Sequence, residues 1–511
     1  HPSLVAECFQ IQAPSLIPHQ IPAPPADFTG REDELAALLQ AQADGICIAG
    51  AQGMGGIGKS ALAFALADRL AENYPDGQVM LDLLGTSQQP LPPEQAMAQV
   101  IRVWQPEARL PESESELQKI YLSVLHGKRL ILLLDNARGA AQVMPLIPPK
   151  SCLLLVTSRW HFPLPGMKNC DVEALKEEEA VRLLITIAPR LEFPSPGRGE
   201  GAGVRGEDGR PAAQALAELC GRVPLALRAA ASALKLKPSL PVDEYLERFT
   251  QTQARLSLTG MDASLQVSYD LLTSDLQEKL RLLSVFPAPF DRPAAAAVWA
   301  VDKDYAQEAL DALLCASLLE WDVETGFRLH DLVCDFAGGK LSEEERYGAF
   351  IRHAAHYIEV AHQDNEVYNQ GGDNLLKGLH LFDNHWQHIR QGQAWAAGQS
   401  DENTDILLLR NSYPSAAIDC LILRLHYSEL ISWLNIALEA ARKLGLIAAE
   451  GTHLGNLGNV YSGLGQVDKA IEYFCQALLI NQKIDNKQGT CAILGNLGIA
   501  YRKLGKYHEA F

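Results

Sequence analysis

Hydrophobic and polar positions follow two different patterns along the chain. In the first third, short apolar runs alternate with segments of helical periodicity, which predicts a parallel sheet covered by helices. The apolar runs that we interpret as strands are residues 45–49, 78–83, 130–134 and 153–156. The helices expected around them are residues 33–40, 61–67, 93–104, 114–125 and 173–187. Beyond this region the pattern is helical almost throughout, so an α/β domain is expected to be followed by helical domains.

A group of helices in the middle of the chain ends in a predicted β-hairpin. The helices are expected at residues 265–272, 275–286, 293–298 and 305–316, and the two strands at residues 318–321 and 326–329. Helices closed by a hairpin are typical of a winged-helix domain, and this one leads directly into His330 and Asp331. The expected recognition helix, residues 305–316, contains no arginine or lysine, which argues against contacts with nucleic-acid phosphates.

The last part of the chain contains a repeat. Residues 455–461 recur as residues 495–501, at an offset of 495 − 455 = 40. At the same offset, residues 431–438 are a degenerate earlier copy of residues 471–478. Small and aromatic residues alternate where paired helices must pack closely, which predicts a helical-hairpin solenoid. Such arrays need about three repeats for stability, so this one is expected to continue beyond Phe511. The chain is therefore expected to be an internal piece of a longer protein.

The segment from Gly53 to Ser60 carries the most specific chemistry. It fits the phosphate-loop (P-loop) pattern G-x-x-x-x-G-K-[ST], and it lies between a predicted strand and a predicted helix. Its glycines allow backbone N–H groups to turn toward a phosphate, and the helix that follows directs the positive end of its dipole at the same anion. Lys59 would reach the β- and γ-phosphates, and the hydroxyl of Ser60 would bind Mg²⁺.

Two further residues are expected at the carboxyl edge of the same sheet. Asp135 ends the run 130–134, 135 − 59 = 76 residues after the lysine, and is placed to bind Mg²⁺ through water. Arg159 follows the run 153–156 and is placed to sense the γ-phosphate. The sequence therefore predicts a site for a nucleotide and Mg²⁺, in which Lys59, Asp135 and Arg159 carry the chemistry.

Composition narrows the range of functions. The chain has 44 basic and 62 acidic residues, a net charge of −18, which argues against binding nucleic acid through diffuse charge. Its ten cysteines include no C-x-x-C pair, which suggests a reduced, cytoplasmic setting. No apolar run approaches the roughly 20 residues that span a membrane. Residues 194–211 are rich in glycine and charge and are expected to be a disordered insertion, in which arginines alternate with acids rather than forming an RNA-binding segment.

The order of the motifs identifies a family resemblance. The chain is similar to the NB-ARC group of STAND signalling ATPases, which includes bacterial proteins, the animal apoptosome scaffold and plant disease-resistance proteins. The resemblance rests on the P-loop, on the repeats and on the motifs Thr29–Glu32, Leu132–Asn136, Thr157–Arg159, Gly221–Leu225 and Leu329–Asp331. The 40-residue period resembles the longer tetratricopeptide variant of kinesin light chains.

The expected fold class is multidomain α/β plus α, with a P-loop parallel-sheet domain, a helical domain, a winged helix and an α-solenoid. The expected boundaries are a Pro-rich linker at 1–26, the P-loop nucleotide-binding domain at 27–170, a helical ARC-like domain at 171–255, a winged-helix domain at 256–340, a helical linker at 341–425 and tetratricopeptide-like repeats at 426–511.

The resemblance also implies roles for individual residues. The nucleotide would be bound by Gly30, Arg31, Gly53, Gly55, Gly56, Ile57, Gly58, Lys59, Ser60, Ala61, Pro224 and His330. Ser60 and Asp135 would hold Mg²⁺. Pro224 would pack against adenine, and His330 would touch the β-phosphate of ADP. Asp331 would hold the imidazole ring or cap the next helix.

The function that the resemblance implies is a signalling switch. ADP would hold a closed monomer, and a protein or peptide read by the repeats would permit exchange to ATP and homo-oligomerisation, as in signal transduction or defence responses. Asn136 stands where many relatives have a second acid, so hydrolysis of ATP is expected to be slow. No contact with a membrane and no direct contact with nucleic acid is expected from this piece.

Two alternatives remain open. One is a transcription regulator with the same core, whose DNA-binding domain lies upstream of this piece. The other is a metabolic P-loop kinase, which the lack of a substrate-lid pattern and the trailing repeats disfavour.

Overall fold

The computed structural model describes residues 17–43, 48–87, 90–192, 212–256, 259–323, 325–400, 403–506 and 508. The chain forms two compact units. The first unit comprises residues 1–105, 110–281 and 307–340, and the second comprises residues 106–109, 282–306 and 341–511. This division passes through the segment 256–340 that the sequence predicts as a winged-helix domain, so the six predicted domain ranges stay predictions.

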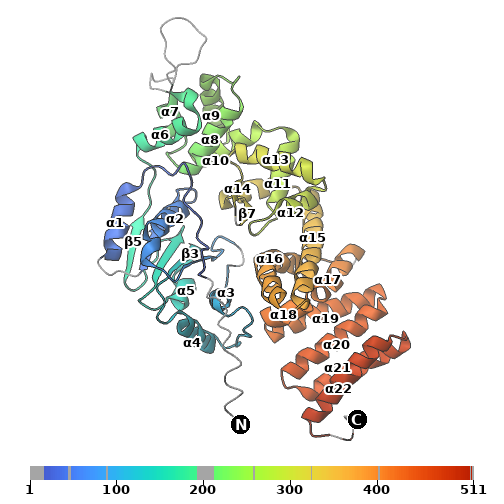
Figure 1. Cartoon of the computed structure of the whole chain (residues 1–511). Helices are drawn as coiled ribbons and strands as arrows, with labels where there is room; N and C mark the ends of the chain where they lie inside the picture. The colour runs from blue at the N-terminus through green and yellow to red at the C-terminus, as the bar shows by residue number, and fades with distance from the viewer. Residues whose placement is uncertain are drawn as a thin grey trace, which may run out of the picture. The chain divides into compact units, whose positions relative to one another are not determined.

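A five-stranded parallel sheet in the order β2-β3-β4-β1-β5 is the centre of the first unit (Figure 1). The strands are β1 (Ile48–Gln52), β2 (Gln78–Asp82), β3 (Ile131–Ala137), β4 (Leu153–Ser158) and β5 (Met167–Asp171). The predicted fold class, a parallel-sheet α/β domain followed by a helical solenoid, is confirmed. Strand β1 was predicted at 45–49, of which residues 45–47 lie outside the described residues. Strand β5 was missed, because it is a mostly exposed edge strand without an apolar run.

Burial on both faces explains why the central strands are continuous apolar runs. The residues Ile131 to Leu134 of β3 have no solvent-exposed surface. The helices next to the sheet in sequence are α1 (Glu32–Ala43), α2 (Lys59–Leu70), α3 (Pro93–Trp104), α4 (Glu114–Leu125) and α5 (Ala140–Val143). The hydroxyl of Tyr121 on α4 donates a hydrogen bond to the carbonyl of Leu146 at 2.6 Å, so this buried side chain is satisfied.

Helices dominate the chain after the sheet. They are α6 (Glu177–Ile187), α7 (Ala212–Leu219), α8 (Pro224–Leu236), α9 (Val242–Leu256), α10 (Gly260–Asp270), α11 (Ser274–Leu283), α12 (Arg292–Trp299), α13 (Lys303–Cys315) and α14 (Asp331–Gly338). The hairpin before α14 consists of β6 (Glu320–Asp322) and β7 (Gly326–Arg328). Helix α6 begins four residues later than predicted, where the carboxylate of Glu179 accepts from the backbone N–H of Lys176 at 3.1 Å. The predicted insertion 194–211 lies outside the described residues.

Paired helices make up most of the second unit. They are α15 (Glu343–Asn369), α16 (Asp373–Ala397), α17 (Thr404–Ala416), α18 (Ile418–Arg424), α19 (Tyr427–Leu444), α20 (Ile447–Gly463), α21 (Val467–Lys483) and α22 (Lys487–Lys503). Helices α20 and α22 begin 487 − 447 = 40 residues apart, as the repeat predicts. A Cβ atom at Gly458 of α20 would lie 2.5 Å from the ring of Phe474 on α21, so the glycine of the repeat permits this close packing.

In the described part of the chain, no single helix is long and apolar enough to cross a membrane. The bent pair of α17 and α18, which meet at 74°, passes that test by length and composition only.

Two buried, neutral histidines link three segments of the second unit through hydrogen bonds. His388 on α16 donates from Nε2 to the carbonyl of Pro289 at 2.9 Å, so its Nδ1 accepts from Nε2 of His353 on α15 at 3.3 Å. Tyr357 stacks on the ring of His388 at 4.2 Å. Burial lowers the pKa of His388 to about 3 and holds the pKa of His353 well below its usual value, and the neighbouring His356 opposes protonation of both rings.

We predict that this histidine pair makes the second unit less stable in acid. The unfolded chain takes up protons on these rings below about pH 6.5, whereas the folded rings stay neutral. Stability should therefore fall between pH 6.5 and pH 5, by up to about 1.4 kcal/mol per pH unit for each histidine. Urea unfolding at the two pH values measures this, with His353→Gln as the test and the exposed His362→Asn as the control. An equal pH dependence in all three proteins would contradict the prediction.

Candidate functional site

The P-loop joins β1 to α2 through a backbone that requires glycine. Gly53, Gly56 and Gly58 have φ angles of 150°, 72° and 95°, in the region that favours glycine. The Nζ atom of Lys59 donates to the carbonyl of Met54 across the loop at 2.8 Å. Burial, together with the charge of Arg159, lowers the pKa of Lys59 to about 8, so the side chain is a cation at neutral pH.

The structure brings the end of the P-loop to Asp135 of β3. The hydroxyl of Ser60 donates to Oδ1 of Asp135 at 2.8 Å, and the hydroxyl of Thr157 on β4 donates to the same oxygen at 2.5 Å. Asp135 is almost fully buried. A hydroxyl and a carboxylate are the oxygen ligands that Mg²⁺ prefers, so Ser60 and Asp135 fit the predicted metal site. The sequence assigned no role to Thr157, which positions the carboxylate.

Asp331, the first residue of α14, meets three side chains from the carboxyl edge of the sheet. Its Oδ2 atom accepts from Nη2 of Arg159, from Nδ2 of Asn136 and from the hydroxyl of Thr86, each at 3.2 Å. Asn136 has a φ angle of 55°, a conformation that asparagine tolerates better than most residues. Sequence reasoning missed this contact and treated Asn136 only as a missing acid.

A second ion pair reinforces the same contact. Nη2 of Arg328, at the end of β7, lies 3.2 Å from Oδ2 of Asp82, at the end of β2. Burial raises the pKa of Asp82 to about 6, an effect that Arg328 partly offsets. Burial also disfavours the charge of Asp331, but Arg328, His330 and Arg159 outweigh it and hold the pKa of this carboxyl below its usual value. The sheet edge therefore faces α14 with paired charges of both signs.

His330 lies beside this cluster and caps α14. Its Nδ1 atom accepts from the backbone N–H of Leu332 at 3.2 Å. The expectation that Asp331 would cap this helix or hold the ring is wrong, because Asp331 is inside the helix and bonds the sheet edge. Burial lowers the pKa of His330, so the neutral ring carries its proton on Nε2, the nitrogen that does not accept.

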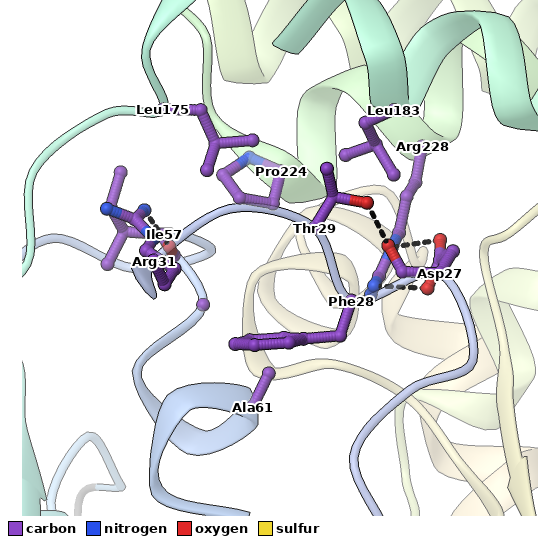
Figure 2. A pocket seen from close by; sticks show the side chains of 11 residues that line it. Asp27, Phe28, Thr29, Arg31, Ile57, Ala61, Leu175, Leu183, Pro224 and Arg228 are labelled. Carbon is purple, nitrogen blue, oxygen red and sulfur yellow. Dashed lines mark hydrogen bonds and ion pairs between the residues drawn. The ribbon is translucent and has the colours of Figure 1, made fainter. Parts of the chain in front are cut away.

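A pocket beside the P-loop collects residues from four parts of the chain (Figure 2). It encloses about 350 Å³, counting space that is open to solvent. The ring of Phe28 lies over Ala61, with Arg31 on one side and Asp27 and Arg228 on the other. The residues that line the pocket are Asp27, Phe28, Thr29, Arg31, Ile57, Gly58, Ala61, Leu175, Leu183, Pro224 and Arg228.

This pocket contains several residues that the sequence assigned to a nucleotide. They are Arg31, Ile57, Gly58, Ala61 and Pro224. Gly30 borders the pocket without lining it; its φ angle is 75°, and a Cβ there would meet the carboxylate of Glu179. Asp27, Phe28 and Arg228 were missed. A signal was available for each, because the first two precede the Gly30–Arg31 motif and Arg228 lies one helical turn after Pro224.

Comparison with known proteins gives three results. A tetratricopeptide repeat model matches residues 449–511. Regulatory protein AfsR from Streptomyces coelicolor is 33% identical over 391 residues, which are 71% of this chain and 38% of AfsR, and AfsR from Streptomyces griseus is 32% identical over 344 residues, 65% of this chain and 34% of its own length. A solved STAND protein with a tetratricopeptide repeat sensor from Pyrococcus horikoshii is similar with a TM-score of 0.46 at 16% identity, covering 98% of this chain and 83% of that protein.

The repeat match confirms the tetratricopeptide-like repeats that the sequence predicts in the last part of the chain. The parallel sheet with its P-loop is the α/β domain that the sequence predicts before them. The chain spans little more than a third of the length of the curated relatives that it matches.

We predict that Gly56→Ala destabilises the first unit more than Gly127→Ala. Both glycines have nearly the same left-handed φ angle, 72° and 76°, so both variants carry the same strain of about 1–2 kcal/mol. At Gly56 the new Cβ would also lie 2.7 Å from Met261 and 3.1 Å from Leu225, whereas nothing lies within 4 Å at Gly127. The clash should cost about 1–3 kcal/mol more. Urea unfolding measures the difference, and equal losses would show that α8 and α10 do not pack on the loop.

Proposed function

We propose that the chain is a nucleotide-dependent signalling switch that binds ATP or ADP with Mg²⁺. The observation that carries this proposal is the contact of Asp331 with Arg159, at 3.2 Å, beside a complete P-loop. A ligand bound at the phosphate end would change the surroundings of Arg159, and Asp331 on α14 would respond. The site therefore links a ligand to the position of a separate structural element, which is the requirement for a switch.

The proposed ligand extends from the P-loop to the pocket. Its phosphates lie against the N-terminus of α2, where Lys59 supplies a cation and Ser60 and Asp135 hold Mg²⁺. Its base lies in the pocket next to Phe28 and Pro224. A bound Mg²⁺ would neutralise phosphate charge and orient the phosphates. Hydrolysis is slow because Asn136, whose amide cannot accept a proton, follows Asp135.

The proposed cycle has two states. With ADP, His330 donates from Nε2 to the β-phosphate and keeps α14 on the sheet edge. With ATP, the protein opens and self-associates. The tetratricopeptide repeats bind the protein or peptide that triggers exchange, since repeats of this type form extended binding surfaces.

A second candidate is a transcription regulator built on the same switch. The names of the relatives, which are regulatory proteins, favour this candidate. It differs from the first in its output and not in its nucleotide site. Binding of DNA by the full-length protein, but not by this piece, would support it.

We predict that Lys59→Ala reduces nucleotide binding below detection, because Lys59 is the cation that the loop itself provides to the phosphates. The matched control is Lys168→Ala, which removes an exposed lysine from the edge strand β5. Calorimetry with ADP and Mg²⁺ measures both variants. Binding by the Lys59 variant that equals the wild type would refute the assignment of the phosphate site.

We predict that His330→Ala releases ADP about 10- to 150-fold faster, since a charge-assisted hydrogen bond contributes roughly 1.5–3 kcal/mol. His330 also caps α14, so the alanine variant loses two interactions. His330→Asn separates them, because asparagine caps helices well but is too short to replace the imidazole donor. Stopped-flow release of ADP and light scattering measure the two variants. A normal release rate in the asparagine variant would mean that His330 acts only as a cap.

A further inference from the structure

The side of the pocket opposite Arg31 is closed by an ion pair between Asp27 and Arg228 (Figure 2). The guanidinium donates from Nε to Oδ2 at 2.8 Å and from Nη2 to Oδ1 at 2.5 Å. About a quarter of each side chain is exposed. Two parallel bonds fix both the position and the plane of the guanidinium, which a single contact would not do.

Local structure holds each partner in place. Asp27 lies within a turn in which the N–H of Phe28 donates to the carbonyl of Pro25 at 2.9 Å, and the hydroxyl of Thr29 donates to the carbonyl of Asp27 at 2.9 Å. Arg228 projects from α8 on the same face as Pro224, one turn away. The N-terminus of α8 in turn bonds the P-loop. The pair therefore connects two walls of the pocket that are far apart in sequence.

Each charged side chain that lines the described part of the pocket has an oppositely charged partner. Arg228 is paired with Asp27, and Arg31 donates to the carboxylate of Glu34 and to the carbonyl of Ile57, each at 2.9 Å. The other described lining side chains, Thr29 excepted, are apolar. Such a pocket suits a flat, uncharged group such as a nucleobase better than a phosphate or a carboxylate.

An arginine that was not paired would change which base this pocket prefers. Guanine presents two adjacent acceptors, O6 and N7, that match the two donors of a guanidinium, whereas adenine presents N7 beside an amino donor. A bidentate arginine contact therefore discriminates in favour of guanine. Asp27 occupies the Nε–Nη2 edge of Arg228, one of the two edges of a guanidinium that can make such a contact, and it fixes the plane of the group.

We propose that Asp27 is a specificity-determining residue that makes the pocket select adenine over guanine by holding Arg228 in a bidentate ion pair. This inference rests on the proposed nucleotide-binding function. Asp27 acts through Arg228 and is a positioning residue. Replacing the carboxylate with an amide frees the guanidinium next to the base, while the phosphate end of the site is unchanged.

The experiment measures the dissociation constants of ADP, GDP and tripolyphosphate, each with Mg²⁺, for the 511-residue chain. The test variant is Asp27→Asn, and the second variant, Asp27→Asn with Arg228→Gln, removes the freed cation while both residues remain polar. Glu32→Gln is the matched control, because it removes a carboxylate from an exposed ion pair with Arg69 outside the pocket. Tripolyphosphate has no base, so its affinity reports the phosphate end and the folding of the domain.

The proposal predicts that Asp27→Asn reduces the preference for ADP over GDP by about 10-fold or more, within the range of about 5- to 150-fold expected for a bidentate base contact. The double variant should recover most of the preference, and tripolyphosphate should bind equally in all proteins. An unchanged ratio of ADP to GDP affinity in Asp27→Asn would overturn the inference. The inference would also be overturned if Asp27→Asn weakened the binding of all three ligands equally and the double variant did not restore it. That result would assign the ion pair a purely structural role. Failure of the wild type to bind any of the three ligands would instead refute the proposed function.

Discussion

The candidate site depends on the P-loop, whose shape is set by the backbone conformation of its glycines and held by helices that pack on it. A Cβ at Gly55 would lie 3.0 Å from Leu332 of α14, and one at Gly56 would meet Leu225 of α8 and Met261 of α10. Three helices from later parts of the chain therefore rest on the two glycines. Glycine provides the positive φ at Gly56, and at both positions the missing side chain provides room for these helices. The loop is therefore in direct packing contact with α14, which His330 caps, and with α8, which carries Arg228.

A cluster of buried and partly buried charges forms at the carboxyl edge of the sheet, next to the P-loop. Asp82, Asp135 and Asp331 face Lys59, Arg159 and Arg328 in an environment that shifts several of their pKa values. Burial disfavours an isolated charge, and the ion pairs of Asp331 with Arg159 and of Asp82 with Arg328 offset part of that cost. Truncating one partner leaves an uncompensated charge, which makes the cluster sensitive to any ligand that adds or removes charge. This sensitivity is what a nucleotide site needs if it is to control α14.

The sequence predicted the parts of this site that depend on local patterns. The P-loop and the apolar strand before Asp135 are contiguous motifs, and the structure joins them through the bond between Ser60 and Asp135. Contacts between residues that are distant in the sequence have no local sequence pattern and could not be predicted in this way. Asp331 was expected to serve its own helix, but it meets Asn136 and Arg159 across the fold. Strand β5 was missed because an exposed edge strand need not be apolar, and the buried pair of His353 and His388 has no sequence pattern that distinguishes it from surface histidines.

Electrostatics gives a physical reason why ATP and ADP would act differently on this cluster. In the proposed site a γ-phosphate would add negative charge close to Arg159, whose guanidinium already pairs with the carboxylate of Asp331 at 3.2 Å. The phosphate and the carboxylate would compete for the same cation, and they would repel each other over a short distance where solvent screens poorly. ADP lacks that charge and would leave the ion pair intact, and the proposed bond from His330 to the β-phosphate would add to it. The two nucleotides would thus interact differently with the position of α14, and such a difference is necessary for a ligand to shift a conformational equilibrium.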